Sequence, residues 1–169
     1  SINDVQGKAA TLAGIANCEG ERGNKTKQLE LNLEAAQIFG QIRAYIDLCG
    51  VLYNLGVADE TKGIIYLAQA VWLCLRVQIP LTDTVNTLAG MYIRVPQGDE
   101  MKALLGTAAY HLCQIRGAEH PQFEELQECS LEILLDAAQA QGIETEEAFE
   151  TWIVQQRLND PEYFIPRLV

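Results

Sequence analysis

Residues 52–80, LYNLGVADETKGIIYLAQAVWLCLRVQIP, constrain the fold of this chain more than any other stretch. The first half carries residues three or four positions apart that share one helix face: Leu52, Leu55, Gly56 and Asp59. After a turn at Lys62-Gly63, the same spacing returns in Ala68, Trp72 and Leu75, and Pro80 closes the unit. Small residues suit the point where two helices cross closely, and a large one fills a gap. The pattern therefore predicts two antiparallel helices that cross at Gly56 and Ala68 and bury Trp72 between them.

This helix–turn–helix unit recurs along the chain. We expect repeats at about 3–40, 43–80 and 81–117, because Gly23 to Gly63 spans 40 residues and Pro80 to Pro121 spans 41. In the first repeat, Asn3 or Asp4 is the expected N-cap. In the third, Pro96 ends one helix and Asp99 caps the next.

The pattern changes beyond Pro121. One long helix is expected from Phe123 to about Gly142, a second helix capped by Thr145, and a last short turn at Asp160-Pro161. Because the end of a stack of repeats needs a polar face, we interpret residues 120–169 as capping helices, with the acid-rich stretch 119–150 as the cap itself.

The unit resembles a tetratricopeptide repeat, whose pattern places Leu-Gly, Ala, an aromatic residue and Pro in this order. The long period of about 40 residues is similar to the bacterial type. The resemblance implies an all-α fold, a right-handed α-solenoid of antiparallel helix pairs with about eight helices, formed by residues 1–169 as a single domain. Residues 1–22 begin inside a repeat-like helix, so we expect the chain either to be a piece of a longer protein with more repeats upstream or to have been cut at a repeat boundary.

The resemblance also implies a site. In such arrays the first helices of successive repeats line a concave groove that holds a peptide or a helix. The groove positions here are Ala13, Asn17, Gly20, Gly50, Tyr53, Asn54, Val57, Glu60, Asn86, Gly90, Ile93 and Arg94. Relatives that clamp a chaperone's terminal carboxylate use cations, whereas this chain has Ala13, Asp83 and Thr87 at those positions. A carboxylate without a cation binds poorly, so the carboxylate clamp is rejected.

Charge and composition narrow the function classes. The net charge is −11, and residues 117–169 hold 12 acids and two bases. The chain has no basic stripe for a nucleic acid and no apolar run long enough for a membrane span. Five cysteines never closer than sixteen positions apart fit a reducing cytoplasm rather than a disulfide framework.

Motifs for catalysis, cofactors or metals are missing from the sequence. His111 and Cys113 are two positions apart and point to different sides of a helix, so they are not a nucleophile–base pair. His120 with Glu124 is the one weak metal candidate, and an exposed loop histidine is the simpler interpretation. We therefore expect no enzyme, no cofactor and no metal.

The sequence predicts a non-catalytic protein–protein interaction module that binds another protein or a peptide in its groove. Two alternatives stay open. The chain can be a regulatory or sensor segment that packs on a neighbouring domain of a larger signalling protein, or a self-associating scaffold that forms homo-oligomers.

Overall fold

The structure is a computed structural model that describes residues 1–167. In this range the chain is 78% helical and contains no strand, which confirms the all-α prediction. The two last residues of the predicted capping segment, 168 and 169, lie outside the described range. The elements are α1 (Ile2–Glu21), α2 (Lys25–Gln41), α3 (Tyr45–Ala58), α4 (Gly63–Arg76), α5 (Leu81–Arg94), α6 (Glu100–Arg116), α7 (Phe123–Gln139), α8 (Glu146–Gln155), α9 (Pro161–Phe164) and the 3₁₀ turn η1 (Ile165–Arg167).

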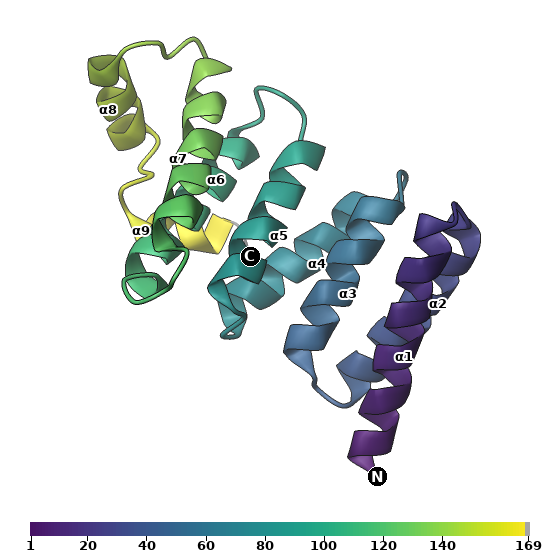
Figure 1. Cartoon of the computed structure of the whole chain (residues 1–169). Helices are drawn as coiled ribbons and strands as arrows, with labels where there is room; N and C mark the ends of the chain where they lie inside the picture. Colours follow the sequence, from purple (N-terminus) through teal and green to yellow (C-terminus); the bar gives the residue numbers. More distant parts are fainter. Residues whose placement is uncertain (168–169) are drawn as a thin grey trace. The chain divides into compact units, whose positions relative to one another are not determined.

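The helices fall into two compact units, Ser1–Pro80 and Leu81–Val169. Each element packs mainly on its neighbours in sequence, α1 on α2, α2 on α3 and α3 on α4 in unit 1 (Figure 1). In unit 2, α5 packs on α6 and α6 on α7. The helix pairs α1–α2, α3–α4 and α5–α6 occupy the stretches where helix pairs were expected, and their identity as repeats stays a prediction. The prediction of about eight helices is close to the nine α-helices that residues 1–167 form.

The first helix pair begins and turns with local caps. The hydroxyl and the terminal ammonium of Ser1 contact the Asp4 carboxylate, so Ser1 is the N-cap and α1 starts earlier than predicted. At the turn, the side chain of Asn24 accepts a hydrogen bond from the backbone N–H of Lys27 and caps α2.

A continuous core joins the four helices of unit 1. Its buried members come from all four helices and the segment that follows them: Ala9, Ala35, Phe39, Cys49, Val51, Leu52, Leu55, Ala70, Leu73, Cys74 and Ile79. Gly56 is buried where α3 meets α4, as predicted, but its neighbours are Gly63 and Leu67. The predicted partner, Ala68, is exposed.

The predicted burial of Trp72 is wrong, because 45% of its surface is exposed. The helix α4 buries Leu67, Val71 and Cys74 instead of the predicted Ala68, Trp72 and Leu75. Both sets have the same spacing, and the observed set is one residue earlier in the chain. One residue rotates the buried face of a helix by about 100°, which places Trp72 on the outer side.

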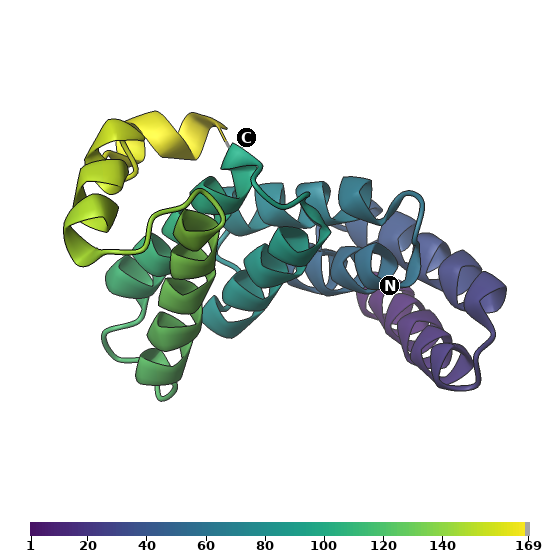
Figure 2. The same ribbon diagram turned by 90° about the horizontal axis from the view of Figure 1, so that it is seen from above.

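In unit 2, α6 lies against α7 at a close crossing where Gly106 faces the backbone of Leu134. Beyond α7 the chain turns back, as the yellow-green and yellow segments of Figure 2 show, and η1 contacts α6. Phe164 stacks edge-on against His111 of α6, with 5.7 Å between the ring centroids, and Arg167 pairs with Glu100 at 3.0 Å. The C-terminal turns are thereby fixed to α6, the second helix of the unit.

The predicted helix boundaries of unit 2 are largely confirmed. The Asp99 carboxylate accepts from the backbone N–H of Met101 at 2.9 Å, and the Thr145 hydroxyl accepts from that of Ala148 at 3.2 Å. Pro161 is the first residue of α9. The long helix α7 ends three residues before Gly142, which adopts a positive φ of 79° in the following turn. Among residues 1–167, none of the helices has the length and hydropathy that crossing a bilayer requires.

Candidate functional site

Two predicted groove residues meet on the surface of unit 1. Asn17 of α1 and Asn54 of α3 are 37 positions apart in sequence, and Nδ2 of Asn54 donates to Oδ1 of Asn17 at 3.4 Å. Asn17 is exposed and Asn54 half-buried. The contact forms because α1 and α3 lie beside each other across α2. We call this pair and the neighbouring Gly50, Tyr53 and Val57 of α3 the amide surface.

The amide surface combines polar and apolar groups. Val57 is 53% exposed, and Tyr53 is half-buried. Gly50 is exposed in the middle of α3, and no atom lies within 4 Å of the position that a Cβ would occupy. A helix-interior glycine costs about 1 kcal/mol relative to alanine. Since packing does not require this glycine, its small size leaves the α3 backbone open to approach from outside.

The remaining predicted residues of unit 1 lie around this surface. Ala13 is half-buried on α1. Gly20 lies over the side chain of Gln28, so its outward direction is closed by its own helix pair. Glu60 follows α3 in the loop, where its carboxylate lies 2.6 Å from Nζ of Lys25. Glu60 therefore ties the loop after α3 to the first residue of α2 instead of extending the helical surface.

The third-repeat residues lie on α5 of unit 2. Asn86 and Ile93 are exposed, Ile93 by 77%, while Gly90 and Arg94 are half-buried. Their spacing places all four on one side of α5. It stays a prediction that these α5 residues and the amide surface line one groove.

The positions of the rejected carboxylate clamp hold no exposed cation. Ala13 is half-buried, Asp83 is exposed, and Thr87 is buried with its hydroxyl donating to the carbonyl of Asp83 at 2.7 Å. Thr87 thus points into unit 2, which the third-repeat register did not predict.

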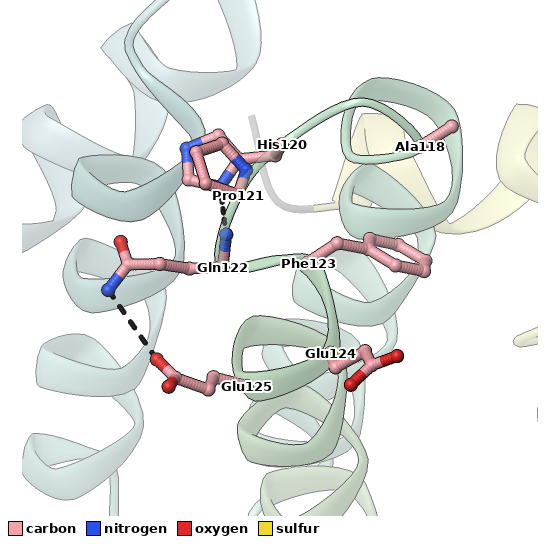
Figure 3. Close-up of a pocket in the computed structure, with 7 residues that line it drawn as sticks. All are labelled: Ala118, His120, Pro121, Gln122, Phe123, Glu124 and Glu125. Carbon is pink, nitrogen blue, oxygen red and sulfur yellow. Dashed lines mark hydrogen bonds between the residues drawn. The ribbon is translucent and has the colours of Figure 1, made fainter.

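The loop between α6 and α7 contains a shallow hollow of about 460 Å³, lined by Ala118, His120, Pro121, Gln122, Phe123, Glu124 and Glu125 (Figure 3). Nδ1 of His120 accepts from the backbone N–H of Gln122 at 3.2 Å, and the Gln122 side chain donates to Glu125 at 3.4 Å. In Figure 3 the Glu124 carboxylate points away from the imidazole. In residues 1–167, no three His, Cys, Asp or Glu side chains gather as a metal site would need.

His111 and Cys113 contact different neighbours, as their spacing predicted. His111 packs on Phe164, and burial lowers the pKa of its imidazole. Cys113 is buried with its Sγ 3.5 Å from Oγ of Ser130, and burial raises the pKa of its thiol. A thiol whose pKa is raised is a weak nucleophile at neutral pH.

Sequence reasoning missed a polar cluster in unit 2. The Tyr92 hydroxyl of α5 donates to the Asp136 carboxylate of α7, and Nζ of the buried Lys102 lies 3.9 Å from the Tyr92 ring centroid. Burial, reinforced by the hydrogen bond and the charge of Asp136, raises the pKa of Tyr92 above its ordinary value. The only sequence signal was a single lysine, Lys102, in the apolar run 101–109. No local pattern linked Tyr92 to Asp136, which lies 44 positions later.

It also missed a cysteine contact in unit 1. Sγ of Cys49 and Sγ of Cys74 lie 3.6 Å apart across α3 and α4, although the cysteines are 25 positions apart in sequence. That separation exceeds the S–S bond length of about 2.05 Å, so the contact is between thiols.

Comparison of the chain with protein-family models, with curated proteins and with solved structures finds no match.

Proposed function

We propose that this chain is a non-catalytic protein-interaction module built from tetratricopeptide-like helix pairs, and that it binds an extended peptide of another protein on the amide surface. The observation that carries the proposal is the contact between Asn17 and Asn54 on neighbouring helices. Helix pairs that pack in sequence order support the repeat interpretation.

The amide pair offers hydrogen bonds of the kind a peptide backbone uses. One amide N–H of Asn54 is directed to the Asn17 oxygen, which leaves the Asn17 nitrogen and the Asn54 oxygen without a protein partner among residues 1–167. One donor and one acceptor held side by side match the C=O and N–H of a peptide group. The mutual hydrogen bond restricts both side chains before binding, which lowers the entropy cost of capture.

The rest of the surface suits the same ligand. Gly50 lets a peptide approach the α3 backbone, because nothing fills the space outside it. Val57 and the half-buried Tyr53 offer apolar and aromatic contact on the same helix. The ligand expected here is an uncharged or weakly charged segment, since Asn17, Asn54, Tyr53 and Val57 carry no charge.

The test is selection from a phage-displayed library of random 16-residue peptides, followed by anisotropy titration of the peptides recovered. Asn17→Ala with Asn54→Ala should weaken binding by about tenfold or more if both are anchors. The matched control is Gln37→Ala with Gln41→Ala, which removes two exposed amides from α2. Gly50→Leu should also block binding while the helical signal stays unchanged. Peptides that bind the double asparagine variant as well as the parent would refute the amide surface.

The proposal extends to the compartment. No disulfide joins cysteines in the described part of the chain, where three of the five are buried within helices. Thiols of this kind support a reducing cytoplasm as the place where the module works.

A further inference from the structure

The outer face of α4 is apolar and exposed. Ile65 and Trp72 have 54% and 45% of their surfaces exposed, and Ile64 and Ala68 are exposed beside them. Their spacing extends this stripe along about two turns of one helix face. Large apolar side chains that gather on one face of a surface helix are characteristic of interaction sites. The amide surface belongs to other helices, so the proposed function leaves this stripe unexplained.

The charged residues of α4 and its N-cap have one sign. Residues 62–80 contain no Asp or Glu, and the cations Lys62 and Arg76 stand at the two ends of the helix. The Arg76 guanidinium carbon lies 5.9 Å from the Trp72 ring centroid. Neither Lys62 nor Arg76 forms an ion pair with another of the residues 1–167. A partner for this face should therefore combine apolar side chains with carboxylates.

Such a face exists on α7 of the same chain. Leu131 and Leu135 are 37% and 38% exposed, and the carboxylates of Glu124, Glu128 and Glu132 lie on the same side of the helix. None of the three glutamates takes part in an ion pair within the described residues. The α7 face thus presents leucines bordered by unpaired negative charge. The helix α7 has 17 residues and α4 has 14.

We infer that the occupant of the α4 stripe is the α7 face of a second copy of this chain. Trp72 and Ile65 would pack against Leu131 and Leu135, with Arg76 and Lys62 near the glutamates. Opposite charges at the edges of an apolar contact fix its register and speed its formation. The contact is heterologous, because each copy contributes a different face, so growth continues from copy to copy unless a ring closes.

The expected association is weak. One helix laid on another lies at the low end of the area that stable interfaces bury, so a dissociation constant in the micromolar range, about 10–100 μM, is expected. The inference does not rest on the proposed peptide binding. The Asn17→Ala/Asn54→Ala variant should associate like the parent, which separates failure of one proposal from failure of the other.

The first experiment is light scattering of the purified chain over a concentration series. The parent should show a mass that increases with concentration, and Trp72→Glu should weaken association by about tenfold or more, as loss of a central aromatic anchor does. Glu128→Lys with Glu132→Lys should weaken it similarly. The matched control is Ile115→Glu, since Ile115 is 63% exposed on α6 outside both faces. A parent that stays monomeric at about tenfold above that dissociation range would overturn the inference.

Mixing the variants gives the sharpest test. Trp72→Glu keeps an intact α7 face, and the double lysine variant keeps an intact α4 face, so an equimolar mixture should form a one-to-one dimer that grows no further. A mixture that stays monomeric, or a Trp72→Glu variant that associates like the parent, contradicts the contact. If Trp72→Glu unfolds, Arg76→Glu replaces it. That change should weaken association in the parent and be rescued when combined with the two lysines, and absence of rescue overturns the pairing.

Discussion

The two units each contain a helix crossing that depends on glycine, but the crossings differ in what faces the glycine. In unit 1, Gly56 of α3 meets Gly63 at the start of α4, and a Cβ on Gly63 would lie 2.2 Å from the Gly56 carbonyl oxygen. In unit 2, Gly106 of α6 meets Leu134 of α7, and a Cβ there would lie 2.9 Å from the Leu134 Cα. At the first crossing Gly63 meets the backbone of Gly56 and Gly56 meets the side chain of Leu67, whereas at the second Gly106 meets the backbone of Leu134.

This difference shows how a short sequence feature controls helix packing. A missing Cβ permits close approach, and the length of the connecting turn decides which residue arrives opposite it. The four-residue turn 59–62 of unit 1 places Gly63 and Leu67 opposite Gly56, not Ala68. The Leu-Gly pattern therefore predicted the position of the crossing on α3 correctly, but it did not predict which residues of α4 lie opposite it.

Substitution at the glycine-to-glycine crossing should have a large effect on the free energy of unfolding. Gly63→Ala should cost about 3 kcal/mol, since the new methyl group meets a carbonyl oxygen that no rotamer change can move. Gly106→Ala should cost about 1–2 kcal/mol, because its clash is milder and alanine favours a helix interior. Urea denaturation of both variants measures the difference, and equal losses would remove the distinction between the crossings.

A matched control comes from the exposed glycine of the amide surface. Gly50→Ala adds a methyl group where no atom lies within 4 Å, so it should stabilise unit 1 by up to about 1 kcal/mol through helix propensity alone. Destabilisation of this variant would mean that the space outside Gly50 is filled in solution.

The core of unit 1 also contains a buried side-chain amide. Asn32 of α2 is fully buried, and neither its side-chain nitrogen nor its oxygen has a hydrogen-bond partner among residues 1–167. Leucine has the same number and branching of side-chain heavy atoms and no polar group. Asn32→Leu should therefore stabilise the chain by about 1–2 kcal/mol, the cost of leaving an amide desolvated. A rise in the urea midpoint checks it, whereas a fall would indicate that a bound water satisfies the amide.

Trp72 tests the observed register of α4. Because it is nearly half exposed, Trp72→Ala should cost only about 1 kcal/mol, well below the 3–5 kcal/mol typical of buried tryptophans. Leu67→Ala, at a fully buried position five residues earlier, should cost about 2–5 kcal/mol. The reverse order in thermal melts would restore the register predicted from the repeat pattern.

The smallest effect concerns pH and unit 2. Burial lowers the folded-state pKa of His111, so the folded form binds its proton less readily than the unfolded form. Its contribution is fully present above the unfolded pKa of about 6.5 and is lost as the pH falls through the lowered value. The free energy of unfolding measured from pH 8 to pH 5 should fall less steeply in His111→Gln than in the parent. Identical slopes would show that protonation of His111 does not contribute to the pH dependence of stability.

The sequence by itself determined the helices and most of their ends. Local signals sufficed here, because Asp99, Thr145 and Pro161 cap or start helices through contacts within a few residues of themselves. The helix spacing of the repeat pattern that the chain resembles also placed Asn17, Gly50 and Val57 of α1 and α3 outward, and all three are exposed. Those features follow from helix periodicity, which is a property of the chain alone.

Only the tertiary structure decided which of two equally apolar stripes of α4 is buried. Leu67, Val71 and Cys74 fit the helical spacing as well as Ala68, Trp72 and Leu75 do, and the choice rests on how α3 and the turn position α4. The tertiary structure alone also brings together three pairs of residues: Asn17 with Asn54, Cys49 with Cys74, and Tyr92 with Asp136. These pairs are 25 to 44 positions apart, so their contacts depend on the packing of whole helices, which local spacing does not encode.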